Sequence, residues 1–169
     1  MSKKTQEKVS QNGSESKIVY DNIITAILID GGFYRKRIHA CFSKMSAMEC
    51  ANHLESYVKR HLSEKINGIE HVHSLYRIFY YDCPPVDKAI YNPVEKKNIE
   101  LKNTDTYKWT SSFFEELKKR RKFALRMGEL SDAEQGYYLP LSKTKLLLDN
   151  KLRADEIKLS DLKLLMKQK

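Results

Sequence analysis

The stretch IITAILIDGG, residues Ile23–Gly32, decides the fold of this chain. Its first seven residues, Ile23–Ile29, are apolar or β-branched and carry no charge. A run this short and continuous predicts a strand buried on both faces, as in a parallel sheet. The run ends in Asp30-Gly31-Gly32, and the pattern beyond it is helical. We therefore expect a strand that turns directly into a helix.

The aspartate at the end of this strand is a candidate functional residue. In open α/β sheets, ligands bind at the carboxyl ends of the strands. Asp30 would bring a carboxylate to that edge, and Gly31 and Gly32 would let backbone or substrate approach closely. The alternative is that Asp30 only caps the next helix and that the glycines only form the turn. The residues alone leave both interpretations open.

A second apolar run, LYRIFYY at Leu75–Tyr81, also ends in an aspartate, Asp82. The sequence between the two runs is helical, and the order strand, helices, strand predicts a right-handed crossover and a parallel pair. Both strands then bring an aspartate to the same edge of the sheet. Because two carboxylates near one edge can bind a hard cation, this edge is the candidate functional site.

The other elements follow from caps and periodicity. Ser46 with Glu49 three residues later predicts a capped helix that continues to Lys65. The side chains expected on its buried face are Met48, Leu54, Val58 and Leu62. Further helices are expected at Tyr34–Ser43, at Leu146–Leu148 and at Ser160–Lys169. Another helix is expected to begin at Thr110 or Ser111 and to include the basic run that ends at Lys122. Strands are expected at Phe123–Met127 and at Tyr137–Leu141, and the second of these is expected to pair with Gly128–Leu130. The turn signals within Asp87–Asp105 predict a long irregular connection.

Length and composition fit one domain preceded by a polar tail. The 169 residues lie within the range of about 100–200 residues typical of a domain. Residues 1–17 are rich in Lys, Ser and Gln, and we expect a disordered tail there and the domain at 18–169. No run approaches the ~18 consecutive apolar residues of a membrane span, so no membrane partner is expected.

The cysteines and histidines show no metal-binding pattern. The three cysteines have neither paired nor zinc-ligand spacing, and we interpret them as reduced thiols of a cytoplasmic protein: Cys41, Cys50 and Cys83. Four histidines match no ligand motif, and we interpret them as ordinary surface or boundary residues: His53, His61, His71 and His73.

The positive charge favours a polyanionic partner. The formal net charge is +9, and the densest cluster holds six basic residues between Lys118 and Arg126. A polyphosphate backbone would bind such a cluster by charge, with strong salt dependence. The candidate nucleic-acid-binding residues are Arg35, Lys36, Lys119, Arg120, Arg121, Lys122 and Arg126. The alternative is a solvated basic surface without a partner.

Four segments, in this order and spacing, resemble the amino-terminal portion of bacterial NYN-domain proteins: AILIDGGFYRKR, YRIFYYDCPP, NPVEKK and FFEELKKRRKFALRMGEL. They cover roughly residues 20–130. The resemblance implies a PIN-like fold, which is a Rossmann-like three-layer α/β/α arrangement around a parallel sheet, and metal-dependent ribonuclease activity on RNA. It also implies that Asp30 is a catalytic residue and a ligand of Mg²⁺ or Mn²⁺. Asp82 lies in a motif of the subfamily and is the second candidate catalytic residue.

The resemblance also implies that part of the acidic site lies outside this sequence. In proteins of this type, a tract like Lys167–Lys169 is followed by Gly-Val-Asp and later by a Gly-Asp-Ser-Asp-type turn, whereas this sequence ends at Lys169. We therefore expect a fold that is incomplete at the carboxyl terminus, a metal ion held weakly by Asp30, and little activity of the chain alone.

Three hypotheses follow for the function. The first is a ribonuclease-family chain that acts on or binds RNA, and the second is a catalytically inactive nucleic-acid-binding module. The third is an interaction subunit that a partner completes. In the family's fold the strand that would flank Ile23–Ile29 on its free side lies in the segment this sequence lacks. We therefore expect an edge strand there, through which the chain would dimerise or bind a complementing chain.

Overall fold

The computed structural model describes residues 18–42, 44–130 and 136–165. They fall into two compact units. The sheet unit comprises the residues up to Tyr81 together with Phe113–Arg126, and the hairpin unit comprises Asp82–Ser112 and the residues from Met127 onward. Among the helices of these residues, none combines the length and apolar character that crossing a bilayer requires.

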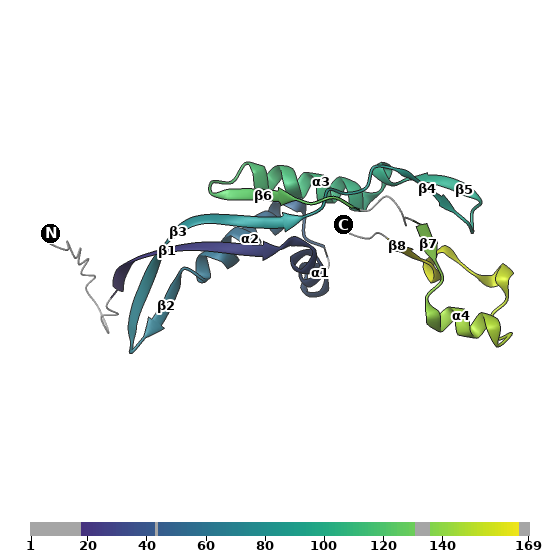
Figure 1. Ribbon diagram of the computed structural model, residues 1–169, viewed down its shortest axis with the longest axis horizontal. Helices are drawn as coiled ribbons and strands as arrows, with labels where there is room; N and C mark the ends of the chain where they lie inside the picture. The colour runs from purple at the N-terminus through teal and green to yellow at the C-terminus, as the bar shows by residue number, and fades with distance from the viewer. Residues whose placement is uncertain (1–17, 43, 131–135, 166–169) are drawn as a thin grey trace. The chain divides into compact units, whose positions relative to one another are not determined.

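The sheet unit is built on a four-stranded sheet (Figure 1). Its strands are β1 (Ile18–Asp30), β2 (Ser63–Ile66), β3 (Ile69–Asp82) and β6 (Phe123–Met127). β1 pairs with β3 in parallel, with Ile27 opposite Ile78, and β2 pairs antiparallel with the beginning of β3. β6 also pairs with β3 and runs in the same direction as β1 and β3. The predicted parallel pair is therefore confirmed, in a mixed α/β fold with a mostly parallel central sheet.

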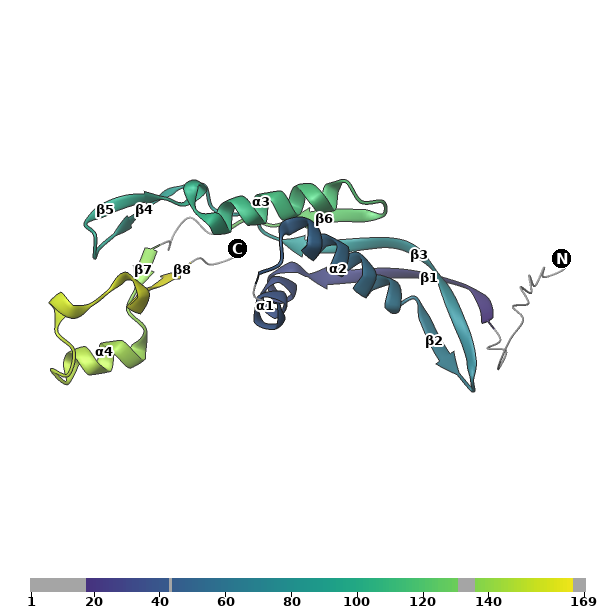
Figure 2. The ribbon, with the colours of Figure 1, turned by 180° about the vertical axis from the view of Figure 1, so that it is seen from behind.

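Helices cover one face of this sheet. They are α1 (Gly31–Cys41), α2 (Ala47–Arg60) and the end of α3 (Asp105–Lys118). α2 crosses in front of β1 and β3 in Figure 2 and lies behind them in Figure 1. The fully buried side chains of this layer include those of Leu54, Ile78, Tyr80 and Phe113, because β3 presents Ile78 and Tyr80 to the helices.

The helix boundaries differ from the predicted ones for local reasons. α1 begins at Gly31 because Asp30 caps it. Ser46 and Glu49 form the predicted capping box. α2 ends at Arg60 rather than at Lys65, because Ser63–Ile66 form β2, which pairs with β3. The turn between these two strands is formed by Asn67 and Gly68, which adopt positive φ angles of 51° and 78°. Two side chains expected on the buried face of this helix do not lie there: Met48 is 57% exposed, and Leu62 lies beyond the helix.

The expectation that Ile23–Ile29 is buried on both faces is wrong. Ile24 and Leu28 are 74% and 66% exposed, and Ile23 is 51% exposed. Thr25, Ile27 and Ile29 are only partly buried. Helices α1 and α2 cover the face to which Ile27 and Ile29 belong, and alternation along the strand places Ile24 and Leu28 on the other face. An apolar run therefore predicts a strand, but it does not show whether both faces of that strand are buried.

The hairpin unit consists of short elements. Its strands are β4 (Ala89–Asn92), β5 (Lys97–Glu100), β7 (Gly136–Tyr138) and β8 (Lys163–Leu165). β4 pairs with β5 and β7 with β8, both antiparallel. The helical segments are α4 (Leu141–Leu148) and the 3-10 turns η1 (Leu101–Asn103), η2 (Ala154–Glu156) and η3 (Leu159–Asp161).

Several predictions in and beside this unit are corrected. Asp87–Asp105 is not irregular but contains the β4–β5 hairpin, whose turn is closed by Asn92 Oδ1 accepting from the backbone N–H groups of Val94 and Glu95. α3 begins at Asp105, after the Thr104 hydroxyl that accepts from Tyr107 N–H, so Thr110 is a buried interior residue and not a cap.

The carboxyl-terminal predictions are confirmed in part. The helix at Leu146–Leu148 exists and begins at Leu141. The strand near Tyr137 is β7, and its partner is β8 instead of Gly128–Leu130. Ser160 lies in the 3-10 turn η3, which is followed by β8, so no helix begins there. The predicted tail at residues 1–17 and the last residues of the expected helix lie outside the described residues.

Candidate functional site

Asp30 is the last residue of β1 and the N-cap of α1. Its Oδ1 accepts a hydrogen bond of 2.8 Å from Phe33 N–H, while the side chain remains exposed. This satisfies one of the backbone donors that a helix start leaves without a partner. The capping interpretation is therefore confirmed, and it does not use the second carboxylate oxygen.

The two glycines hold the turn between Asp30 and α1. Gly31 is buried, and its carbonyl accepts a hydrogen bond of 3.3 Å from the Tyr80 hydroxyl. At Gly32, a Cβ atom would lie 3.4 Å from Asp30 Oδ1. The hydrogen bond to the Gly31 carbonyl thus connects the turn to Tyr80 of β3. Gly32, which has no Cβ atom, leaves room beside the Asp30 carboxylate.

The register of β1 and β3 places Asp30 among residues that the helices do not cover. Leu28 lies opposite Phe79, and Asp30 lies opposite Tyr81, which is 46% exposed. The Arg126 guanidinium of β6 lies 5.3 Å from the centre of the Phe79 ring. The residues of this open face are Leu28, Asp30, Arg77, Phe79, Tyr81 and Arg126.

The open face combines three chemical functions. A carboxylate can bind a hard cation, an exposed guanidinium can bind a phosphate, and an aromatic ring can stack on a base. Among the predicted site residues, the structure places Asp30 and Arg126 on this one face. Our sequence analysis missed Arg77, Phe79 and Tyr81. Their signal is the period of two in RIFYYD, Arg77–Asp82, in which every second residue faces away from the core.

Asp82 occupies a different environment. It is 6% exposed, and its Oδ1 accepts a hydrogen bond of 2.8 Å from the backbone N–H of Cys83. Its carbonyl accepts another from Gly128 N–H. Asp82 belongs to the hairpin unit, and the strand register aligns Asp30 with Tyr81. Within the described residues, no group of three or more His, Cys, Asp or Glu side chains is placed to hold a metal ion.

The predicted basic cluster is largely engaged within the protein. Arg120 donates to Glu55 at 2.5 Å and to Asn52 at 2.6 Å. Lys122 has a positive φ of 70° and donates to the Leu75 carbonyl. The remaining exposed members are Lys118 and Lys119, which pair with Glu115 and Glu116, and Arg121. Exposed lysine–glutamate pairs of this kind contribute about 0–1 kcal/mol, so these lysines can exchange partners.

The candidates on α1 lie beside the Asp30 turn in sequence. Lys36 is exposed, whereas Arg35 is partly buried. Tyr34 and Ile38 on the same helix face the core. Of these two candidates, Lys36 is therefore the one that is available to an anion.

Arg120→Ala is expected to lower the free energy of unfolding by about 1.5–3 kcal/mol, the range for hydrogen bonds to charged groups. Hydrogen bonds from Lys59 and Arg120 lower the pKa of Glu55. A carboxylate with a lowered pKa in the folded state stabilises at neutral pH and loses that contribution as the pH falls through the lowered pKa. The difference between wild type and Arg120→Ala in urea unfolding should therefore shrink in acid. Arg121→Ala, at an exposed position, serves as the control, and an equal loss in both variants would contradict the structural role of Arg120.

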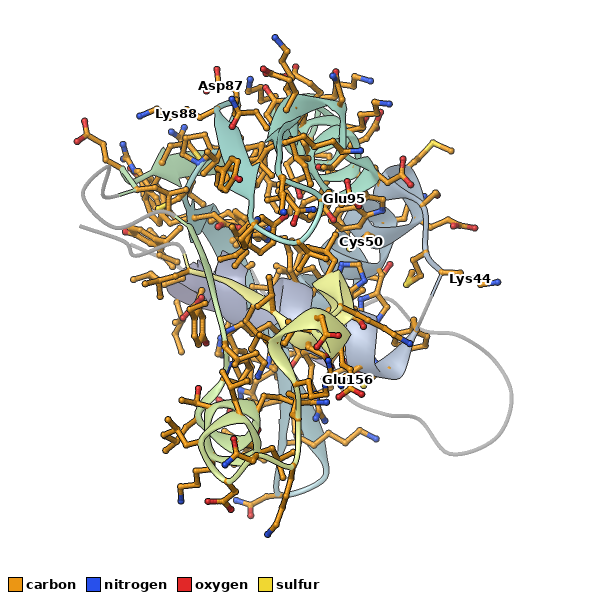
Figure 3. All side chains as sticks on the ribbon, turned by 90° about the vertical axis from the view of Figure 1, so that its right-hand side faces the viewer. Lys44, Cys50, Asp87, Lys88, Glu95 and Glu156 are labelled. Carbon is orange, nitrogen blue, oxygen red and sulfur yellow. The ribbon has the colours of Figure 1, made fainter. Side chains whose placement is uncertain are left out.

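A buried hydrogen-bonded cluster accounts for the cysteine and histidine nearest the core. The Tyr34 hydroxyl lies 3.1 Å from the Cys50 carbonyl and 3.2 Å from His53 Nδ1. Burial raises the pKa of both the Tyr34 hydroxyl and the Cys50 thiol. Figure 3 shows Cys50 in the interior and Lys44 reaching outward. This thiol is therefore held protonated and unreactive, and the cluster is structural.

None of the three cysteines forms a disulfide, and Cys41 alone of them is exposed.

Comparisons of this chain with models of protein families, with curated proteins and with solved structures find no match. The candidate site is therefore defined by its own residues and their geometry.

Proposed function

We propose that this chain binds single-stranded RNA on the open face of its sheet, as a cytoplasmic protein of the NYN, PIN-like ribonuclease class. The observation that carries the proposal is the combination on one exposed face of Tyr81, the Arg126–Phe79 pair and Asp30. Aromatic rings and arginines on an exposed sheet are a common means of binding single strands. The net charge of +9 agrees with a polyanionic ligand.

The family assignment rests on the four sequence segments quoted above. It is supported by the parallel pairing of β1 with β3 and by the position of Asp30 at the carboxyl end of β1. A Rossmann-like, PIN-like fold is the finer form of the same proposal.

Asp30 fits a divalent cation only as a single ligand. Mg²⁺ is commonly bound by one or two carboxylates together with waters and substrate phosphates. Asp30 is exposed and provides one carboxylate, while the described residues offer no group of three ligands. Mg²⁺ or Mn²⁺ held there would polarise a phosphate or activate a water. We propose that binding is weak and that cleavage by this chain is correspondingly slow.

Arg77→Glu combined with Arg126→Glu should weaken binding of single-stranded RNA at least about 10-fold at moderate salt. Loss of two phosphate contacts should also reduce the slope of log K against log salt by about 1.4. Fluorescence anisotropy with a labelled oligonucleotide at several salt concentrations measures both quantities. Lys59→Glu combined with Arg60→Glu changes the charge equally at exposed sites on α2, which covers the opposite face of the sheet. Equal effects of the two double variants would overturn the proposed face.

Tyr81→Ala separates stacking from charge. Base stacking on an aromatic side chain contributes about 1–3 kcal/mol, which corresponds to roughly 5- to 150-fold in affinity. Because no charge is removed, the salt slope should stay unchanged. Binding that is indifferent to this substitution would remove the ring from the proposed interface.

The second candidate function is RNA binding without cleavage. It is favoured by the scarcity of acidic ligands around Asp30 within the described residues. Mg²⁺-dependent cleavage of RNA by the purified chain distinguishes the two, since only the first candidate produces it.

A further inference from the structure

The turn that follows β1 is held to β3 by a buried side chain. Pairing of the two strands ends where Asp30 lies opposite Tyr81, and the next residue, Gly31, is the first of α1. The Tyr80 hydroxyl reaches past the end of this pairing and donates its hydrogen bond of 3.3 Å to the Gly31 carbonyl. Tyr80 is fully buried, so this bond is made on the face of the sheet that the helices cover.

Aromatic neighbours fix the position of the Tyr80 hydroxyl. The rings of Phe113 and Phe114 lie 5.8 Å and 6.3 Å from the Tyr80 ring and meet it at angles of 73° and 67°. Edge-to-face contacts of this kind favour one orientation of a buried ring. Because the core around a buried ring is closely packed, the hydroxyl is held toward the Gly31 carbonyl before any ligand binds.

The direction of the Asp30 carboxylate depends on the same turn. Asp30 is exposed, and its Oδ1 accepts the hydrogen bond of 2.8 Å from Phe33 N–H in the first turn of α1. Both partners of that bond move together with the start of α1. A bond that fixes Gly31 relative to β3 therefore also fixes the second carboxylate oxygen relative to the open face. Misplacement of a reacting group by about 1 Å can lower a rate about 100-fold, so this anchoring has a consequence for function.

We propose that Tyr80 is a positioning residue, whose hydroxyl holds the Asp30–Gly31 turn so that the Asp30 carboxylate faces a divalent cation on the open face. The inference rests on the proposed function of Asp30 as a metal ligand. Tyr80 itself touches neither the cation nor RNA, because its side chain is buried under the helices. It acts through the backbone of the turn, as groups behind a metal ligand commonly do when they orient that ligand.

Tyr80→Phe tests this role, because it removes the hydroxyl and keeps the ring between Phe113 and Phe114. Tyr34→Phe is the matched control, since Tyr34 is also a buried tyrosine, and its hydroxyl donates to the Cys50 carbonyl of α2 at 3.1 Å instead of to the turn. Each variant loses one buried hydrogen bond, so the two should lose similar stability in urea unfolding. Far-UV circular dichroism confirms that both are folded.

Two measurements on the full chain distinguish the variants. Amide hydrogen exchange of Phe33 should become about 5-fold faster in Tyr80→Phe, the effect of one lost hydrogen bond on the opening of the turn, and should stay within about 2-fold of wild type in Tyr34→Phe. Mn²⁺ titrated into the isotope-labelled wild type should broaden the amide signals of residues 30–33. Its Kd should rise about 2-fold or more in Tyr80→Phe alone, because a smaller fraction of the turn is then competent to bind.

The outcomes separate the inference from the function on which it rests. Unchanged exchange of Phe33 or an unchanged Kd for Mn²⁺ in Tyr80→Phe would overturn the positioning role. Equal changes in Tyr80→Phe and Tyr34→Phe would overturn it as well, since any lost core hydroxyl would then have the same effect. A wild type in which Mn²⁺ broadens none of these amides would overturn the proposed metal role of Asp30, and the exchange of Phe33 would still decide whether Tyr80 holds the turn.

Discussion

Phe113→Ala is expected to lower the free energy of unfolding by about 3–5 kcal/mol, the range for removing a buried phenylalanine side chain. Phe113 is fully buried, and its ring lies 6.4 Å from that of Tyr34 and 5.8 Å from that of Tyr80. Its removal leaves a cavity where α1, β3 and α3 meet. Because a domain is stable by about 5–15 kcal/mol, the sheet unit would lose a large part of its stability.

Urea unfolding followed by circular dichroism measures this loss. Phe33→Ala is the matched control, since Phe33 is 68% exposed and its truncation should change the stability by no more than about 0.5 kcal/mol. Phe113→Leu, which keeps most of the apolar volume, should fall between the two. A loss below about 1 kcal/mol for Phe113→Ala would mean that the core is not centred on this ring.

The elements predicted best were those whose local signals agree with their tertiary environment. Phe123–Met127 is a strand with the predicted bounds, and the Ser46 capping box begins α2 as expected. The parallel pairing of β1 and β3 followed from the order of elements. In each case a short-range rule and the final packing favour the same structure.

The failures have physical causes. The β4–β5 hairpin was missed because the sequences of its four-residue strands, AIYN and KNIE, show no clear alternation of apolar and polar residues. Its turn depends on Asn92, whose side chain accepts two backbone hydrogen bonds. The Asn67-Gly68 turn was overlooked because the helical pattern of α2 continued to Lys65. The burial of Ile23–Ile29 was overestimated, because the sequence of one strand does not show whether helices cover one face of the sheet or both faces.

The candidate site was predicted in part. The end of an apolar strand located Asp30, and capping of the next helix was one of the two interpretations that the residues left open. Arg120 was chosen by charge density alone, yet Glu55 holds it from a helix 65 residues away in the chain. A partner at that distance leaves no local signal. The aromatic residues of the open face have a sequence signal in the alternation along β3, but the strand register is what places Phe79 and Tyr81 beside Leu28 and Asp30.

Asp30→Asn is expected to abolish the Mg²⁺-dependent cleavage of RNA while leaving the fold intact. Asparagine caps helices about as well as aspartate, so the hydrogen bond from Phe33 N–H is kept and only the negative charge is lost. Neutral amide oxygens bind Mg²⁺ far less well than carboxylates, which removes the one ligand that the open face provides.

Asp30→Ala separates the two roles of this side chain. It removes both the charge and the cap, so it should also lower the free energy of unfolding by about 0.5–2 kcal/mol, whereas Asp30→Asn should not. Cleavage by wild type is measured first with and without EDTA, to isolate the metal-dependent part. Equal metal-dependent rates for wild type and Asp30→Asn would reduce Asp30 to a helix cap. Loss in both variants, with a stability change confined to Asp30→Ala, would show that the carboxylate acts beyond capping.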